Sequence, residues 1–216
     1  MAKTTLYFVR HGESLYNAKG VIQGHVMENG NTLSETGKHQ AKNLKQKLSK
    51  VDFHAFLSSP SIRALETCKI ISDGQAHKIV IIDDLREKGQ GAMAGMKKTD
   101  IKKFYANWSK MSDDENLDFK AFPDEESQRE LRIRVLKTIN EIVKSHEGKT
   151  VLIATHGGYM RSIYNFLKEI SFKRPMKFQN CGYLKVEHED GKLVVTETEK
   201  LKELSDDEFF GIKNDQ

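Results

Sequence analysis

Cysteine and long apolar runs are both scarce in this chain of 216 residues. Its two cysteines, Cys68 and Cys181, suggest neither a disulfide framework nor a cysteine-based metal site, so we expect reduced thiols in or near the core. No apolar stretch approaches the roughly 18 residues of a membrane-spanning helix, and the N-terminus runs into a strand without the apolar region of a signal peptide. The sequence therefore predicts a cytoplasmic protein without a membrane partner.

Long basic blocks and linker-like stretches are also missing. The 35 Lys and Arg residues stand against 31 Asp and Glu residues, and the resulting net charge of +4 is spread along the chain. This pattern argues against a nucleic-acid partner and suits an anionic substrate. A chain of this length can bury a substantial core without metal or disulfide support.

What is present is an apolar strand that ends abruptly in polar residues. The strand begins at Leu6 and stops at Arg10, His11 and Gly12, which a core would not accommodate. In an open α/β sheet, ligands bind at the carboxyl ends of strands. Gly12 allows a sharp turn and is expected to leave room for a ligand against its peptide group. A strand end with a solvated arginine and a hydrogen-bonded histidine is the alternative for this stretch alone.

A second strand, over 53–57, leads to another cation. Ser59 is expected to cap a helix in which Pro60 is the first residue, because proline at that position loses no needed N–H. Arg63 then lies in the first turn of this helix, just beyond a strand end. Taken alone it would be a surface arginine, but an anion would give it a function there.

The third and fourth strands each precede a further ionisable residue. A wholly apolar strand over 79–82, expected to be covered on both faces, leads to a loop that carries Glu87. A strand over 150–154 ends in His156 and Gly157 before another helix. This second His-Gly pair at a strand end repeats the first and favours a shared site.

Alternation of strands and helices predicts the fold class: α/β, as a single three-layer domain with a mostly parallel central sheet and helices on both faces. Helices are expected after Ser34 and after Ser127. Two further strands, about 181–187 and 193–198, are joined by a hairpin turn at 189–191.

The domain is expected to span residues 1–204. Residues 97–123 would form an inserted lid or side wall, because loops over a site commonly determine substrate choice. Residues 205–216 form an acidic tail that is expected either to be disordered or to dock its two phenylalanines on the domain.

If the strand ends meet at one edge of the sheet, Arg10, His11, Arg63 and His156 can surround one small tetrahedral anion, and phosphate fits this set best. His11 could act as the nucleophile once its attacking nitrogen is unprotonated, and neighbouring arginines would lower its pKa. Glu87 could protonate the leaving oxygen. Two histidines and one glutamate without clustered carboxylates make a poor metal site, so no metal or other cofactor is expected.

The motifs resemble the histidine phosphatase superfamily in its phosphoglycerate mutase-like branch. They follow the family's order between residue 4 and about residue 167: Arg10-His11-Gly12-Glu13-Ser14, Ser58-Ser59-Pro60, Arg63-Ala64, Leu85-Arg86-Glu87, Glu126-Ser127 and Thr155-His156-Gly157-Gly158.

The resemblance implies a role for each motif residue. His11 would be transiently phosphorylated and Glu87 would donate the proton. The phosphoryl group would be bound by Arg10, Arg63 and His156.

The resemblance also implies a second set of phosphate and substrate contacts. Asn17 and the backbone of Gly157 would add phosphate contacts, the latter at a helix N-terminus. Gln23 and Gly24 would lie in the same pocket and are typical of the phosphatase members.

The substrate is expected to be a small phosphorylated metabolite, and the reaction to be phosphomonoester hydrolysis. Mutases of the family carry an arginine and a tyrosine that grip phosphoglycerate where this chain has 87–91, Glu-Lys-Gly-Gln-Gly. Phosphoglycerate mutase is nevertheless one alternative. A catalytically weak protein that binds a phosphorylated ligand or a partner is another, motivated by Ala94, where many members carry glutamate. The lengthened loop between Gly24 and Leu33 could reshape the pocket mouth. The sequence decides neither the physiological substrate nor the oligomeric state.

Overall fold

The strand β1 (Thr4–Arg10) lies inside the sheet and is buried along its whole length. Its side chains alternate between two cores, as the period of a strand requires. Leu6 and Phe8 pack into the core cluster that includes residues of α6 (Gln128–Ser145) and α7 (Gly157–Leu167). Tyr7 and Val9 pack into the cluster that includes residues of α2 (Glu35–Lys47) and α3 (Ile62–Ile71). The continuous apolar run of β1 is thus explained by helices on both faces.

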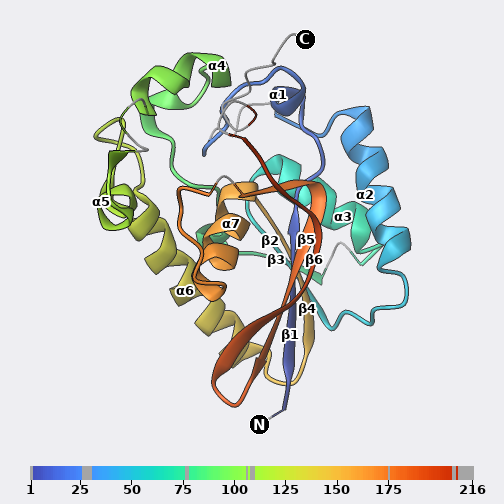
Figure 1. Ribbon diagram of the computed structural model, residues 1–216. Coiled ribbons are helices and arrows are strands. Elements are labelled where there is room, and N and C mark those ends of the chain that lie inside the picture. Colours follow the sequence, from blue (N-terminus) through green and yellow to red (C-terminus); the bar gives the residue numbers. More distant parts are fainter. Residues whose placement is uncertain are drawn as a thin grey trace.

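This computed structural model describes residues 2–25, 31–75, 78–105, 107, 110–174, 176–205 and 208. Within these ranges the sheet has the strand order β3-β2-β4-β1-β5-β6. β1, β2, β3 and β4 pair in parallel, whereas β5 and β6 are antiparallel. Figure 1 shows α2 and α3 on one side of the sheet and α6 and α7 on the other. The expected single α/β domain is confirmed. The remaining strands are β2 (Ala55–Ser58), β3 (Ile79–Ile81), β4 (Thr150–Thr155), β5 (Met176–Glu189) and β6 (Lys192–Glu203).

The shorter helices lie toward the carboxyl ends of the parallel strands (Figure 1). They are α1 (Leu15–Ala18), α4 (Lys98–Ile101) and α5 (Asp113–Asp118), with 3₁₀ turns at Asp83–Leu85, Gly91–Met93 and Lys102–Tyr105. None of the helices in the described ranges has the length and apolar content needed to cross a bilayer.

The helices predicted after Ser34 and after Ser127 are confirmed, and each serine side chain accepts a backbone N–H three residues later. The predicted cap at Ser59 is wrong. Helix α3 begins at Ile62, with Ser61 at the N-cap, so Pro60 precedes the helix instead of opening it. The Ser59 hydroxyl accepts the Ser61 N–H at 3.3 Å and is thereby kept at the strand end.

The predicted third strand is confirmed as a parallel strand, but the expectation that it is covered on both faces is wrong. β3 is the edge strand and pairs only with β2. Val80 and Ile81 are each 54% exposed. An apolar run of this length fits a covered strand and an edge strand equally well, so the sequence pattern could not place it.

The predicted hairpin is confirmed, and its strands are longer than expected. Asp190 and Gly191 both have positive φ (49° and 76°), as a two-residue hairpin turn demands. β5 begins at Met176, before the predicted start at about residue 181. The strand continues through an irregularity at Cys181, whose φ is 52°. Cys68 and Cys181 are free and buried, as predicted. Apart from Ser205 and Glu208, the predicted acidic tail lies outside the described residues.

Candidate active site

The end of β1 brings Arg10 against the N-terminus of α7. Arg10 follows Phe8 on the face that carries α7, and a Cβ on Gly157 would lie 3.3 Å from Arg10 Nε. Arg10 Nη1 donates to the Phe178 carbonyl at 2.6 Å. Its Nε is buried without a hydrogen-bond partner in the described part of the chain. A buried guanidinium N–H left over in this way is suited to an anion.

Gly12 contacts α2 instead of the cavity. A Cβ at Gly12 would lie 2.5 Å from the Gly37 carbonyl oxygen, and the Gly12 N–H donates to Thr67 Oγ1 at 3.0 Å. The expectation that Gly12 leaves room for a ligand is therefore wrong, because the first turn of α2 packs into that space. Glycine is required here for close helix packing.

The two hydrogen bonds of His11 define its tautomer. Nδ1 lies 2.7 Å from the Gly12 carbonyl, which can only accept, so Nδ1 carries the proton. Nε2 is then the bare nitrogen and accepts from Arg63 Nε at 3.2 Å. Burial, followed by the charges of Arg63 and Arg10, holds the pKa of His11 well below its ordinary value. His11 is thus a neutral imidazole with an unprotonated Nε2.

Arg63 links the two histidines that the sequence placed on different strands. Its Nη2 lies 3.2 Å from His156 Nδ1 and 3.2 Å from the Gly24 carbonyl, and it donates toward both acceptors. His156 therefore carries its proton on Nε2, which donates to Ser59 Oγ at 2.8 Å. Burial lowers the pKa of Arg63 to about 10, with the Glu87 carboxylate opposing the shift, so the guanidinium is charged at neutral pH.

Glu87 is bound by the N-terminal turn of α7. Its carboxylate accepts the N–H of Gly158 and of Tyr159, each at 3.1 Å, and the N–H of Lys88 at 2.9 Å. α7 has no side-chain cap from His156, and Glu87 satisfies these orphan donors in its place. A Cβ on Gly158 would lie 2.4 Å from Glu87 Oε1, so glycine is needed for this contact.

The loop after β1 supplies Asn17, Gln23 and Gly24. Ser14 caps α1 and forms a capping box with Asn17, and the Ser14 hydroxyl also donates to Gln23 Oε1 at 3.0 Å. Asn180 Nδ2 donates to the His11 carbonyl at 3.0 Å and lies 3.4 Å from Asn17 Oδ1. These bonds hold the loop against the end of β1.

A cavity of about 230 Å³ lies above the strand ends. Eight of the nine predicted site residues line it; these are Arg10, His11, Asn17, Gln23, Gly24, Arg63, Glu87 and Gly157. His156 is fully buried, does not line the cavity, and contacts two residues that do, Arg63 and the ring of His11. The structure thus brings the predicted residues together, and a direct contact of His156 with phosphate stays a prediction.

Two lysines in the cavity wall were missed by the motif analysis. Lys98 opens α4 and Lys177 lies near the start of β5. Neither ammonium has a carboxylate within ion-pair distance among the described residues. Burial, then the charges of Lys177 and Arg10, lower the pKa of Lys98 to about 8. Lys98 lies in the segment expected to form a side wall, whereas Lys177 precedes the predicted start of its strand, so no strand-end pattern pointed to it.

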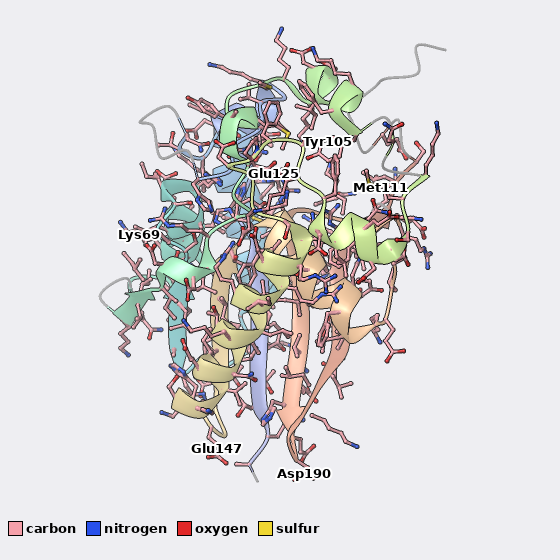
Figure 2. The ribbon with its side chains drawn as sticks, turned by 90° about the vertical axis from the view of Figure 1, so that its left-hand side faces the viewer. Lys69, Tyr105, Met111, Glu125, Glu147 and Asp190 are labelled. Carbon is pink, nitrogen blue, oxygen red and sulfur yellow. The ribbon has the colours of Figure 1, made fainter. Side chains whose placement is uncertain are left out.

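A third lysine in the wall, Lys88, is neutralised by the protein itself. Its ammonium forms a buried ion pair with Glu125. Glu125 also accepts from Tyr105 Oη at 3.0 Å and from the Ala121 N–H at 2.7 Å. Figure 2 shows Tyr105 and Glu125 close together at the end of the molecule opposite Glu147 and Asp190. The charge of Lys88 is therefore compensated by Glu125 inside the fold.

These residues can perform phosphoryl transfer. The cavity presents a bare imidazole nitrogen, two buried guanidinium groups and a carboxyl group beside them. Phosphoryl transfer requires an in-line nucleophile, positive charge around the equatorial oxygens and a proton for the leaving oxygen. The backbone N–H groups at the start of α7 add a favourable field for an anion.

Comparisons with known proteins agree with this chemistry. The family model described as "Histidine phosphatase superfamily (branch 1)" matches residues 6–200. The chain is 29% identical over 205 residues to the metal-independent phosphoserine phosphatase of Arabidopsis thaliana, covering 94% of this chain and 84% of that protein. It is 32% identical over 158 residues to phosphoglycerate mutase-like protein 4 of the same plant, covering 72% and 67%. The structure of Bacillus stearothermophilus YhfR matches with a TM-score of 0.77 at 27% identity, over 89% of this chain and 95% of that one.

Proposed function

The chain belongs to the histidine phosphatase superfamily (branch 1) and is a phosphoric monoester hydrolase, and we propose that it transfers the phosphoryl group of a small metabolite first to His11 Nε2 and then to water. The observation that carries this proposal is the unprotonated Nε2, which accepts from Arg63 on the wall of the cavity. The pKa of His11 lies well below its ordinary value, so the nucleophile needs no prior deprotonation at neutral pH.

In the first half-reaction, a bond forms between His11 Nε2 and phosphorus while the ester P–O bond breaks. Arg63 Nε, which donates to Nε2 in this structure, turns its N–H to an equatorial phosphoryl oxygen. The unpartnered Arg10 Nε offers a second donor. Glu87 in its protonated form transfers the proton to the leaving oxygen, which departs as an alcohol.

In the second half-reaction, water attacks phosphorus and the N–P bond breaks. Glu87, now a carboxylate, takes the proton from this water, and inorganic phosphate leaves. Three backbone N–H groups orient the Glu87 carboxyl group, which lines the cavity.

Hydrolysis is favoured over the mutase reaction by the ion pair of Lys88. The position after Glu87 is where mutases of the family carry an arginine that grips phosphoglycerate, and here that side chain is buried against Glu125. A cavity of about 230 Å³ is smaller than the roughly 300–1,000 Å³ of many ligand sites and fits a small metabolite. O-phosphoserine is the first substrate to test, because the phosphoserine phosphatase relative aligns with 94% of the chain.

The test is to trap the phosphoenzyme. Rapid acid-free quenching of the wild-type protein with ³²P-labelled substrate should yield a labelled protein whose label is stable in alkali and lost in acid, as a phosphohistidine is. His11→Gln should abolish the label and lower kcat by at least about a thousandfold, because the nucleophile is gone. His39→Gln, at an exposed position on α2, is the matched control and should keep both.

An active His11→Gln variant, or a label that survives acid, would refute the proposal. The mutase alternative makes a different prediction. It requires that unlabelled phosphoglycerate receive the ³²P from the enzyme faster than water does.

A further inference from the structure

Two carboxamide side chains in the cavity wall have buried polar atoms without a hydrogen-bond partner among the described residues. Asn116 is 1% exposed, and neither its Oδ1 nor its Nδ2 is paired. Gln128 Oε1 is likewise buried and unpaired. Both residues line the cavity that contains His11. Burying polar groups without partners destabilises a fold, and at the wall of a cavity a ligand would supply the missing partners.

The two helices that carry these amides are joined to each other. Asn116 lies on α5 and Gln128 is the first residue of α6. Arg129, the next residue, forms ion pairs with Asp114 at 2.8 Å and Asp118 at 2.6 Å, which attach α5 to the start of α6. In Figure 1, α5 lies beside α6. Joining the two helices pre-organises this part of the cavity wall to recognise a ligand.

The chemistry of the amides differs from that of the phosphate end. Arg10 and Arg63 offer only donors, as a phosphoryl group requires. Asn116 and Gln128 offer two carbonyl oxygens, which accept hydrogen bonds and therefore need a ligand group with N–H or O–H donors. Between these ends the cavity is lined partly by apolar side chains, among them Phe119.

We infer that Asn116 and Gln128 form a specificity subsite that binds an ammonium or hydroxyl group on the leaving-group side of the substrate. This inference rests on the proposed function and makes the preferred substrate a phosphate monoester whose leaving group carries a hydrogen-bond donor. The amide Nδ2 of Asn116 accommodates an acceptor on the same group, such as a carboxylate oxygen. Lys98 and Lys177, which line the same cavity without ion-pair partners among the described residues, suit that negative charge.

Three substrates that differ by one substituent test the subsite. O-phosphoserine carries an ammonium group and 3-phosphoglycerate carries a hydroxyl group in its place, whereas the phosphate ester of 3-hydroxypropanoate has neither. The wild-type kcat/KM should be higher for one or both donor-bearing esters than for the donor-free ester, and the faster of the two identifies the donor. Asn116→Leu should lower kcat/KM for that ester by about 10- to 100-fold and change the donor-free ester by less than about threefold.

Thermal stability separates a binding role from a structural one. If Asn116 serves the ligand, Asn116→Leu should keep or raise the Tm, because an unpaired buried amide is replaced by an apolar group of similar size. The matched control is Asn165→Leu. Asn165 is also 1% exposed with an unpaired Oδ1, but it lies on α7 outside the cavity lining, so its variant should keep the wild-type substrate ratio.

Equal losses on all three esters, no change on any of them, or a wild-type enzyme without preference for a donor-bearing ester would each overturn the subsite. p-Nitrophenyl phosphate distinguishes this failure from a failure of the proposed function. His11-dependent hydrolysis of that ester upholds the phosphatase while the subsite fails. If p-nitrophenyl phosphate and all three esters remain intact, both proposals fail.

Discussion

Acid should destabilise this fold through two buried histidines, His11 and His156. Burial, followed by the charge of Arg63, holds the pKa of His11 and of His156 well below the ordinary value of 6.5. Both are neutral in the folded protein, whereas in the unfolded chain they bind protons below about pH 6.5. The unfolded state then binds more protons, so the free energy of unfolding falls as the pH falls.

The expected slope follows from this difference. Each histidine contributes up to about 1.4 kcal/mol per pH unit below the unfolded pKa, until its folded pKa is reached. Two histidines give up to about 2.7 kcal/mol per pH unit, a large part of the roughly 5–15 kcal/mol that stabilises a typical domain. Asp83 and Asp118 have lowered pKa values, so their contributions are lost only below about pH 4. The window from pH 6.5 to 5 therefore reports the histidines.

Urea unfolding followed by circular dichroism at several pH values measures this slope. His11→Gln removes one titrating group and keeps an acceptor for Arg63, so the slope should fall to about half. His39→Gln, on the exposed face of α2, should leave it unchanged. If wild-type protein and His11→Gln lose stability at the same rate between pH 6.5 and 5, the interpretation of His11 as a buried neutral imidazole is refuted.

Three further substitutions test the contacts around Glu87 and Lys88. Glu87→Gln should slow hydrolysis of an alkyl phosphate by about 10²- to 10⁴-fold and that of p-nitrophenyl phosphate far less, because a good leaving group needs no acid. Equal losses on both substrates would contradict a proton-donor role. Gly158→Ala should show the same selective loss in a steady-state assay, because its Cβ would lie 2.4 Å from Glu87 Oε1. Unchanged rates would exclude a role of the α7 N-terminus in positioning Glu87. Lys88→Met should cost about 3–5 kcal/mol in urea unfolding by leaving Glu125 buried without its cation, and the double variant with Glu125→Met should recover most of it. A stable single variant would refute that account.

The family match and the donor set of the cavity narrow the alternatives raised by the sequence. A catalytically weak binding protein does not account for the relatives, which include phosphatases, nor for the retained Glu87 and His11. Ala94, which motivated that alternative, lies just after the 3₁₀ turn Gly91–Met93 and does not line the cavity of His11. Its departure from the usual glutamate therefore leaves the described site intact.

The sequence by itself determined the sheet edge at which the site lies. Arg10, His11 and His156 are polar residues that directly follow apolar strands, and parallel strands bring their carboxyl ends to one edge. The signal is strong because both the apolar run and its interruption are local. The helices after Ser34 and after Ser127 also rest on local signals, and the sequence predicted both. Pro60 and β3 were misread, because a cap choice between neighbouring serines and the exposure of an edge strand depend on distant packing.

Only the tertiary structure decided how the site residues act on one another. The bare Nε2 of His11 accepts from Arg63, 52 residues away, and the carboxylate of Glu87 is bound by backbone groups 71 and 72 residues away. No sequence period encodes such contacts, because they arise where separate elements meet. The same holds for Asn116 and Gln128, which read as ordinary helix residues in the sequence. The buried amide atoms that lack partners among the described residues, both of Asn116 and Oε1 of Gln128, became visible only when α5 and α6 were placed around the cavity.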